Sequence, residues 1–306
     1  PRLPGFQSTP GPYGCDRGAA RAVFTGTAQC DRKPSPTGGL AGSTRDLRPT
    51  AKRKIMSQGS RQIPLLLSMP QPCSYLPNRF AANLVVDPAV GVDMTLYSQL
   101  IRQGFRRSGR ILYRPHCEKC RQCLSLRIPV NDFAVRRRHR RVLQRNRELA
   151  LNPCNARFQQ EHFELFQRYT ASRHSGGSMA ESDIQEYQDF LTADWNDTLF
   201  LEMREHGRLL AVAVTDEVSD GLSAVYTFFE PELPQRSLGT FAVLSQLSLA
   251  RQLGLPHLYL GYWIRDCAKM AYMADYRPMQ VYSQGRWRQF ELHQAVQVPE
   301  LPDIHA

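Results

Sequence analysis

The sequence predicts an α+β fold, in which a cysteine-rich N-terminal region precedes a mixed α/β domain. Three apolar runs bounded by turn residues, at 199–204, 209–215 and 223–229, indicate consecutive antiparallel strands. A segment at 240–253 then carries apolar residues at helical spacing, and a further strand is expected at 257–262. Strands and a helix in this order indicate one sheet with a helix packed on it.

The chain divides into three parts by composition. Residues 1–55 contain seven Pro and eight Gly and show no apolar periodicity, so we expect a disordered basic tail there. Because the first methionine is Met56, two interpretations stay open: the tail precedes the natural start, or it is a true extension. A cysteine- and arginine-rich region follows at 70–147, and a second domain at 157–301.

The individual elements follow from apolar spacing and from Gly and Pro stops. The expected helices lie at 95–105, 136–150, 161–173, 183–191, 240–253 and 267–274. The expected strands lie at 111–113, 124–129, 199–204, 209–215, 223–229, 257–262 and 280–283. In the second domain, three antiparallel strands, a helix, a strand, a helix and a strand make up the core of an N-acetyltransferase-like fold.

The net charge of +11 is concentrated in two segments. Residues 1–55 carry ten Lys or Arg against three Asp or Glu, and residues 102–147 carry fifteen against two. The rest of the chain is net acidic. A basic band of this kind is typical of a surface that meets a polyanion.

Membrane and secreted classes are not indicated. No apolar run approaches the roughly 18 residues of a membrane helix, and the N-terminus lacks the continuous apolar stretch of a signal peptide. Eight cysteines in 306 residues do not indicate a disulfide scaffold, which is usually a short secreted chain. We therefore expect a cytoplasmic protein with no membrane partner.

Four cysteines form the first candidate site. Cys117, Cys120 and Cys123 follow one another at two-residue gaps, and Cys73 lies upstream. Two interpretations stay open. The thiols hold zinc or an iron–sulfur cluster, with His116 as a spare ligand, or they are small buried groups of a substrate pocket without metal.

A cluster of arginines next to these cysteines forms the second candidate site. Arg106, Arg107 and Arg110 lie beside Gly104 and Gly109, whose backbone can approach a ligand closely. Guanidinium groups can hold a carboxylate or phosphate in bidentate geometry. We expect these arginines and the four thiols to bind substrate.

The helix expected at 136–150 is a candidate RNA-binding surface. Residues 136–147 contain seven arginines, which repel one another at helical spacing unless an anion neutralises them. Such a track contacts a nucleic-acid backbone through charge rather than base sequence, and we expect RNA rather than DNA. The predicted RNA-binding residues are Arg136, Arg137, Arg138, Arg140, Arg141, Arg145 and, from the second domain, Arg236.

Arg236 belongs to a loop at 235–240 that precedes a helix. An acetyltransferase holds the pyrophosphate of coenzyme A in such a loop. Arg236 and Gly239 fit that pattern, but Phe241 stands where a small residue is needed. Coenzyme A is therefore a weak candidate for the donor.

Aromatic and charged side chains gather after the strand at 257–262, which is typical of a cleft that stacks a base or sugar. The residues concerned are Tyr259, Tyr262, Trp263, Tyr272, Tyr276, Arg265, Asp266 and Lys269. A carboxylate or a phenolic hydroxyl can relay a proton. The candidate catalytic residues are Asp266, Tyr262 and Tyr226.

Taken in order, these segments resemble the aminoacyl-tRNA–protein transferases of the N-degron pathway. The matching segments are Cys73, YSQLIRQGFRRSG, YRPHCEKCRQC, RHSGGSM, YTFFEPELPQRSLGT and LYLGYWIRDCAKMAY. The chain length and the CxxCxxC spacing resemble the bacterial aspartate/glutamate leucyltransferase branch. The resemblance implies an acetyltransferase-like C-terminal domain. It also implies transfer of leucine from leucyl-tRNA to the α-amine of proteins that begin with Asp or Glu, which marks them for degradation.

In that family setting we expect the cluster of Arg106, Arg107, Arg110 and the thiols to hold the acidic N-terminal residue. The arginines at 136–147 would hold the acceptor stem. The cleft bordered by Tyr226, Arg236, Tyr262 and Asp266 would hold the aminoacylated adenosine. An aminoacyl ester is already activated, so transfer requires alignment and oxyanion stabilisation but no cofactor. The alternatives are an arginyl-tRNA–protein transferase of the same family, a coenzyme A-dependent N-acetyltransferase, and a non-enzymatic metal-stabilised RNA-binding protein.

Overall fold

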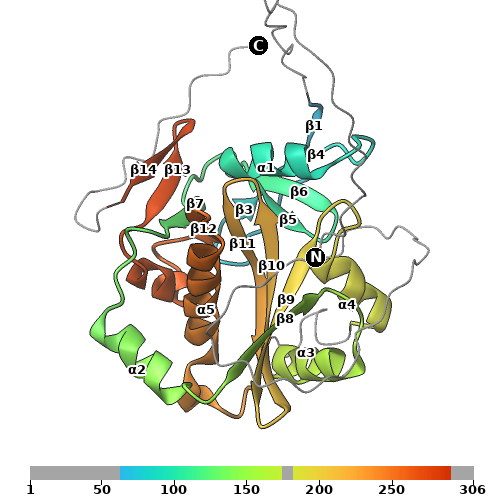
Figure 1. Ribbon diagram of the computed structural model, residues 1–306. Helices are drawn as coiled ribbons and strands as arrows, with labels where there is room; N and C mark the ends of the chain where they lie inside the picture. Colours follow the sequence, from blue (N-terminus) through green and yellow to red (C-terminus); the bar gives the residue numbers. More distant parts are fainter. Residues whose placement is uncertain (1–62, 174–181, 291–306) are drawn as a thin grey trace, which may run out of the picture. The chain divides into compact units, whose positions relative to one another are not determined.

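The computed structural model of the chain describes residues 63–173 and 182–290 (Figure 1). The expected tail at 1–55, the loop at 174–179 and the end of the second domain beyond 290 lie outside the described residues. All the described residues belong to the same structural unit.

The described elements follow the predicted order with several additions. The helices are α1 (Met94–Arg102), α2 (Arg137–Arg145), α3 (Gln160–Arg173), α4 (Ile184–Leu191), α5 (Leu238–Gln252) and the 3-10 helices η2 (Pro234–Arg236) and η3 (Ala268–Asp275). The first strands are β1 (Leu65–Leu67), β2 (Gln71–Pro72), β3 (Phe80–Ala81), β4 (Asn83–Val86), β5 (Arg106–Ser108), β6 (Ile111–Pro115) and β7 (Leu124–Pro129). The later strands are β8 (Ala150–Asn155), β9 (Thr198–Glu205), β10 (Arg208–Val218), β11 (Gly221–Phe229), β12 (His257–Trp263), β13 (Gln280–Ser283) and β14 (Arg286–Gln289).

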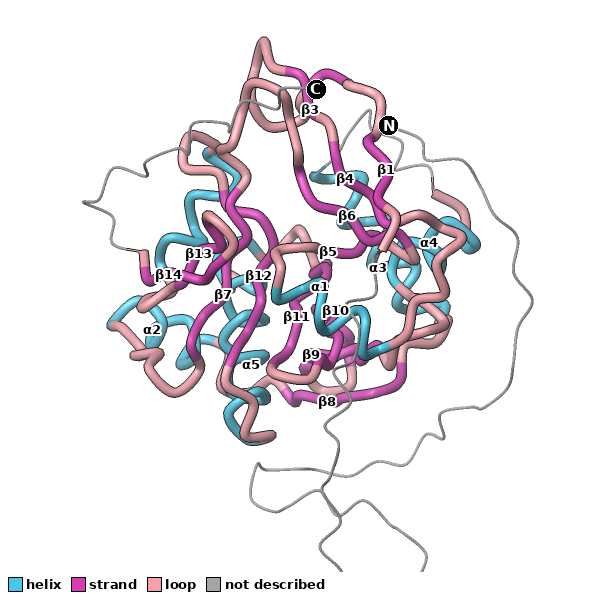
Figure 2. Tube along the Cα trace, turned by 90° about the horizontal axis from the view of Figure 1, so that it is seen from above, coloured by secondary structure: helices cyan, strands magenta, loops and turns pink. Residues whose placement is uncertain are grey.

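An eight-stranded mixed sheet forms the centre of the fold, with the order β14-β13-β7-β12-β11-β10-β9-β8. Every neighbouring pair in it is antiparallel except β11 and β12, which run parallel. Figure 2 shows these strands side by side from β7 to β8. A four-stranded sheet of order β1-β4-β6-β5 and the pair β2–β3 complete the described strands. The protein therefore has a mixed α/β fold.

Helices pack on the central sheet and bury its apolar side chains. α5 lies against β10, β11 and β12 (Figure 1), where Ala242 and Leu247 join the largest core cluster. α3 and α4 form a second cluster, in which Phe166, Tyr187 and Phe228 are almost fully buried. Burying one such side chain contributes about 1.5–3 kcal/mol. None of the described helices is long and apolar enough to cross a lipid bilayer.

β7 links the two halves of the chain. It comes from the arginine-rich region, yet it pairs with β12 on one side and β13 on the other. Its side chains Leu126 and Ile128 are fully buried. The regions at 70–147 and 157–301 therefore share one sheet.

The basic helix is shorter than predicted, and a strand follows it. Helix α2 ends at Arg145, where the Asn146 side chain donates to the carbonyl oxygens of Val142 and Arg236. The chain then forms β8, which contains Pro153. Proline has no N–H for a ladder bond, and it is tolerated here because β8 is the edge strand of the sheet. Because proline is rare in strands, the sequence pattern did not predict β8.

Candidate active site

The strands β11 and β12 diverge and leave a cavity between them. They pair only from Gly221 opposite His257 to Ser223 opposite Tyr259. Beyond Ser223 the backbone groups of β11 that face β12 have no partner among the described strands. A cavity of about 160 Å³ lies at this place, which we call the split cavity. It is lined by Tyr75, Arg106, Arg107, Tyr113, Ser223, Ala224, Val225, Leu260, Gly261, Tyr262, Met270 and Met273.

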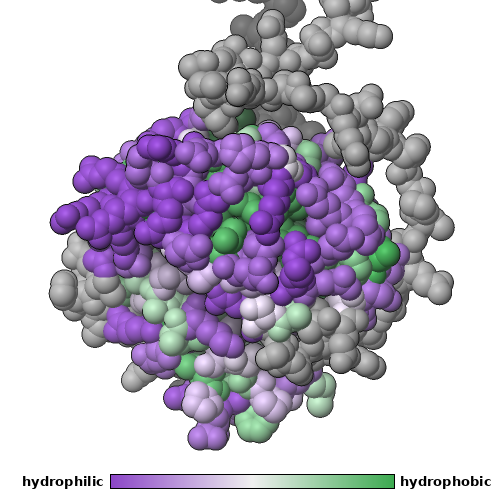
Figure 3. All heavy atoms as spheres, turned by 90° about the horizontal axis from the view of Figure 1, so that it is seen from below, coloured by the Kyte–Doolittle hydropathy of each residue, from purple (hydrophilic) through white to green (hydrophobic). Residues whose placement is uncertain are grey.

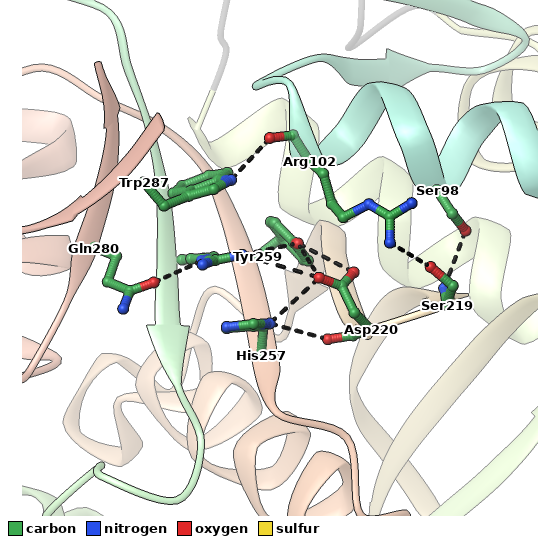
Figure 4. A network of polar contacts seen from close by, with 9 residues as sticks. Ser98, Arg102, Ser219, Asp220, His257, Tyr259, Gln280 and Trp287 are labelled. Atoms are coloured by element: carbon green, nitrogen blue, oxygen red, sulfur yellow. Dashed lines mark hydrogen bonds and ion pairs between the residues drawn. The ribbon is translucent and has the colours of Figure 1, made fainter. Parts of the chain in front are cut away.

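A polar network ties the two strands together where they still pair (Figure 4). Asp220, in the turn before β11, accepts hydrogen bonds of 2.9 and 3.1 Å from the Tyr259 hydroxyl and lies 3.4 Å from Nδ1 of His257. Burial acts to raise the pKa of Asp220, but hydrogen bonds from His257 and Tyr259 outweigh it and lower the pKa. Arg127 of β7 donates to Gln280 at 2.7 Å. This network fixes the Tyr259 ring and the closed end of the split.

Arg106 is a buried cation on the wall of the split cavity, with 5% of the residue exposed. Its Nη2 donates to the carbonyl oxygen of Leu126 at 3.0 Å, whereas Nε and Nη1 have no hydrogen-bond partner. The guanidinium lies over the Tyr259 ring, 5.4 Å from its centre. Burial lowers the pKa of Arg106, but a guanidinium remains charged at neutral pH. A buried charge with unused donors can accept an anionic ligand as its partner.

Arg107 has a protein partner instead. Its Nε and Nη2 contact the two carboxylate oxygens of Asp216 at 2.5 and 2.7 Å, and both side chains are fully buried. Asp216 also accepts hydrogen bonds from Tyr97 at 2.8 Å and Thr198 at 2.9 Å. The residue borders the cavity, but its charge is already neutralised. Arg107 therefore joins β5 to β10, and its expected role in holding a substrate stays a prediction.

Arg110 lies outside the cavity lining. Its Nη2 is 2.8 Å from Asp194, and about half of each side chain is exposed. The segment between Gly104 and Gly109, expected as a loop that approaches a ligand, contains strand β5. Of the three arginines, the structure therefore places only Arg106 at the cavity with unused donors.

The four predicted cysteines lie near one another, and Cys267 joins them. Burial, followed by the influence of the neighbouring thiols of Cys117, Cys120, Cys73 and Cys267, raises the pKa of Cys123 to about 12. Cys117 and Cys120 face each other across a tight turn, and all five are free thiols. Among the described residues, no group of three or more His, Cys, Asp or Glu side chains is arranged to hold a metal ion.

Tyr75 connects this thiol cluster to the split cavity. It lines the cavity, and its pKa is raised by burial and then by Cys123, Cys267 and Cys73. The thiols therefore bracket a turn directly behind one wall of the site. The guanidinium of Arg121 donates to the carbonyl oxygen of Cys120 at 2.9 Å and so stabilises that turn.

Of the three candidate catalytic residues, Tyr262 lines the cavity and the other two do not. The Tyr262 hydroxyl lies 2.9 Å from the carbonyl oxygen of Tyr113 and 3.0 Å from that of Gly104. Burial raises the pKa of Tyr262, so its hydroxyl is neutral at physiological pH. Tyr226 packs among aromatic side chains of α3 and α4, with its hydroxyl buried and unpartnered. Asp266 is exposed in the turn after β12.

The arginines of α2 and its N-cap are all exposed. Arg138 pairs with Asp275, and Arg145 donates to the carbonyl oxygen of Gln235. The others make no ion pair with any described residue: Arg136, Arg137, Arg140 and Arg141. Figure 3 shows strongly hydrophilic side chains over a wide area on the left of the molecule, the side on which Figure 1 places α2. This surface is available to a polyanion.

Arg236 is not part of that exposed surface. Its Nη1 lies 2.8 Å from Glu205, its Nε donates to Asn146 at 3.1 Å, and 14% of the side chain is exposed. The guanidinium therefore holds the end of α2 against η2. The expected contact of Arg236 with RNA stays a prediction.

Several lining residues were missed by the sequence analysis. Tyr75 and Tyr113 flank the two cysteine motifs, and Met270 and Met273 come from η3. One signal could have indicated the methionines. They are three residues apart in a segment expected to be helical, a spacing that places two side chains on one face.

Comparison with known proteins identifies the family. Two family models match, one described as the N terminus of arginine-tRNA-protein transferase at 71–141 and one as its C terminus at 161–283. An aspartate/glutamate leucyltransferase from Alkalilimnicola ehrlichii is 50% identical over 228 residues, which are 74% of this chain and 95% of that protein. The chain belongs to the aminoacyl-tRNA–protein transferase family, in its aspartate/glutamate leucyltransferase branch. The resemblance inferred from the motifs is confirmed.

Other relatives agree with this assignment. Aspartate/glutamate leucyltransferases from Alcanivorax borkumensis and Pseudomonas aeruginosa are 50% and 47% identical to this transferase. They cover 71% and 72% of the chain, which spans 90% and 94% of their lengths. As a member of this family, the protein is an aminoacyltransferase enzyme.

Two solved structures are weakly similar to the transferase. The C-terminal domain of a putative lysylphosphatidylglycerol synthetase from Agrobacterium fabrum has a TM-score of 0.36 and 14% identity, over 47% of each chain. L-PGS from Bacillus licheniformis has a TM-score of 0.38 and 11% identity, over 56% of this chain and 50% of that one. Scores at this level support no inference.

Proposed function

We propose that this transferase moves leucine from leucyl-tRNA to the N-terminal α-amine of proteins that begin with Asp or Glu, and so marks them for degradation. One observation carries the choice of acceptor. Arg106 is a buried guanidinium with two unused donor nitrogens on the wall of a cavity between two diverging strands. A side-chain carboxylate supplies the negative charge and an acceptor oxygen that this group lacks.

The Arg106 site explains why neutral and basic N-termini would be poor acceptors. An N-terminal Ala leaves the guanidinium unpaired in a desolvated place, and an N-terminal Lys adds a like charge beside it. We propose that the thiols of Cys73, Cys117, Cys120 and Cys123 shape the wall behind Tyr75. Their spacing in a tight turn supports a packing role.

The proposed chemistry is one acyl transfer. The α-amine nitrogen attacks the ester carbonyl carbon of leucyl-tRNA, a C–N amide bond forms, and the C–O bond to the terminal ribose breaks. The ribose oxygen takes up the proton that the amine loses. An N-terminal α-amine has a pKa of about 7.7–8.0, so a useful fraction is neutral near pH 7.5 without a strong base. Alignment and charge stabilisation therefore remain as the main tasks of the enzyme.

Two features of the split cavity suit these tasks. Backbone N–H groups of β11 that face the split are free to donate to the developing oxyanion, because no described strand pairs with them. Tyr262 holds the carbonyl oxygens of Gly104 and Tyr113 and so sets the position of the wall that carries Arg106. We propose Tyr262 as a positioning residue. The catalytic roles predicted for Tyr226 and Asp266 stay predictions, which mutagenesis can test.

For the donor, we propose that the exposed arginines at 136–147 bind the phosphates of the acceptor stem. Five of them, Arg136, Arg137, Arg140, Arg141 and Arg145, lack an ion-pair partner in the described parts of the chain, so binding RNA would relieve their mutual repulsion. Arg236 keeps α2 in place through Asn146 and Glu205. Because the donor is aminoacyl-tRNA, we propose that the enzyme acts in the cytoplasm.

We also propose that the second domain, 157–301, has an acetyltransferase-type core. Antiparallel β9, β10 and β11, then α5, then β12 parallel to β11 with a split between them, support this assignment. In such a core the acyl donor would enter at the split. The N-terminal region 70–147 would contribute Arg106 and the thiols to it.

A transfer assay tests the proposed function. The full chain is incubated separately with radiolabelled leucyl-tRNA and arginyl-tRNA, together with peptides that begin with Asp, Glu, Lys or Ala. We expect labelled product only with leucyl-tRNA and the Asp and Glu peptides. Transfer of arginine in place of leucine would overturn the donor assignment, and equal transfer to the Lys and Ala peptides would overturn the role of Arg106.

A further inference from the structure

We infer that Leu260, Met270 and Met273 form the subsite for the side chain of the transferred amino acid, and that this subsite makes the enzyme select an aliphatic donor. The inference rests on the proposed function. It assigns the donor side chain to the wall of the split cavity that does not carry Arg106.

The split cavity has two chemically different walls. Its two arginines come from β5, and Tyr75 and Tyr113 come from the segment before β3 and from β6, whereas β11 and β12 contribute the polar residues Ser223 and Tyr262. Its apolar residues come from β11, β12 and η3, and they are Ala224, Val225, Leu260, Met270 and Met273. The acceptor carboxylate matches the first wall, which leaves the second for the alkyl group of the donor.

The apolar wall is built as one surface. Met270 and Met273 are three residues apart on the 3-10 helix η3, so their side chains lie on the same face. Leu260 sits where β12 shifts register against β7, between Tyr259 and Gly261. Leu260 and Met273 belong to the main core cluster and Met270 packs against it. The wall is therefore supported from behind by the core.

The lining also excludes a cationic side chain. None of the described residues that line the cavity is Asp or Glu, so an arginyl group would enter without a carboxylate partner among them. Before the acceptor carboxylate binds, it would also meet the guanidinium of Arg106, and like charges repel strongly in a site of low dielectric. Both effects oppose arginyl-tRNA, and neither affects leucyl-tRNA.

The apolar wall distinguishes donors by the length of the alkyl group, since each methylene placed against it adds buried apolar area. In an apolar pocket, one methylene is worth roughly a 10- to 200-fold difference in kcat/KM. We therefore expect valyl-tRNA to be a poorer donor than leucyl-tRNA by about that factor.

Size variants at Met270 test the inference. Met270 is only partly buried, so the fold tolerates changes there better than at Leu260. We expect Met270→Ala to raise the ratio of phenylalanyl to leucyl transfer at least about 10-fold, because it enlarges the subsite. We expect Met270→Trp to lower leucyl transfer at least about 10-fold, because the larger side chain fills the space that the leucyl group needs. Met69→Ala and Met69→Trp are matched controls on an exposed methionine outside the cavity lining, and they should keep the wild-type ratios.

Binding measurements separate donor selection from loss of catalysis. Amide analogues of leucyl- and phenylalanyl-adenosine, titrated by calorimetry, should reverse their order of affinity between wild type and Met270→Ala. Each variant should keep its preference for Asp over Lys peptides, since Arg106 is unchanged. Donor ratios that stay within about 3-fold of wild type in both variants would overturn the subsite, as one methylene alone is worth more than that. Failure of the wild-type protein to transfer leucine would instead overturn the proposed function.

Discussion

Arg106 and Arg107 are neighbours in β5, yet only Arg107 has a carboxylate partner. Successive side chains of a strand point to opposite faces. Both residues border the split cavity, but Arg107 meets Asp216 at 2.5 Å, whereas Arg106 donates to two main-chain oxygens. One arginine therefore holds the fold together and its neighbour is left with unused donors.

Breaking the Arg107–Asp216 pair is expected to destabilise the protein strongly. Arg107→Met leaves the Asp216 carboxylate buried without a countercharge, which costs about 3–5 kcal/mol of unfolding free energy. The measurement is urea unfolding followed by circular dichroism. The double variant Arg107→Met/Asp216→Leu should recover much of the loss, because it removes both charges.

Arg110→Met is the matched control for that experiment. Its ion pair with Asp194 is about half exposed, so the same substitution should cost less than about 1 kcal/mol. Equal losses of unfolding free energy for Arg107→Met and Arg110→Met would show that burial does not strengthen the effect of the Arg107–Asp216 pair on stability.

Arg106→Met is expected to give the opposite pattern. Removing an incompletely paired buried cation should leave the stability unchanged or raised. Transfer to Asp and Glu peptides should fall by at least about 30-fold in kcat/KM, since losing one partner of a buried charge pair costs about 2–5 kcal/mol. Full activity of a folded Arg106→Met protein would remove the residue from the acceptor site.

The α2 surface predicts a salt-dependent effect on tRNA binding. Replacing Arg137, Arg140 and Arg141 by Ala should weaken binding and make the plot of log affinity against log salt shallower by about 0.7–0.9 per lost phosphate contact. Filter binding at several salt concentrations measures both quantities. The control is Arg286→Ala/Arg288→Ala on β14, which removes exposed charge from another element and should leave the slope unchanged.

Glu202 is expected to account for part of the loss of folding stability at low pH. Burial acts to raise its pKa, but hydrogen bonds from His162 and Arg204 outweigh it and lower the pKa to about 2. A group with a depressed folded pKa stabilises the protein above its unfolded pKa of about 4.3 and loses that contribution as the pH falls toward the folded value. Stability should therefore drop between about pH 5 and pH 2, by up to about 3 kcal/mol from this group.

Glu202→Gln tests this assignment by unfolding between pH 7 and pH 3. The variant should be less stable at pH 7 and should show a flatter decline toward acid. Glu161→Gln is the comparison, since Glu161 shares Arg204 but is about half exposed and should change the profile little. An unchanged acid profile in Glu202→Gln would assign the sensitivity to other carboxylates.

The three candidate catalytic residues are expected to separate on mutation. Tyr262→Phe removes the hydroxyl that holds the carbonyl oxygens of Gly104 and Tyr113, so kcat/KM should fall roughly 10-fold without a shift of the pH–rate profile. Tyr226→Phe and Asp266→Asn should change transfer by less than about 3-fold, because neither side chain lines the cavity. A loss of 100-fold in Asp266→Asn would place that carboxylate at the reaction.

Local patterns predicted most helices and strands of the second domain, because apolar periodicity and turn residues report the neighbours of each position. The strand at 124–129 was predicted with its observed limits, but its place between β12 and β13 was not. Strand β8 was missed because Pro153 and two asparagines weaken the strand pattern. A fold in which distant segments pair cannot be assembled from periodicity alone.

The candidate site divides in the same way. The order of motifs was enough to identify the family, and the sequence predicted anion-binding residues among the arginines before the cysteines. The sequence did not distinguish Arg106 from Arg107, which are the same residue type at adjacent positions. Their difference depends on Asp216, 109 positions away, and on the divergence of β11 from β12. The sequence alone determines which side chains are charged, apolar or able to form hydrogen bonds. Which charges are neutralised, and what shape a cavity has, is decided only when folding brings remote residues into contact.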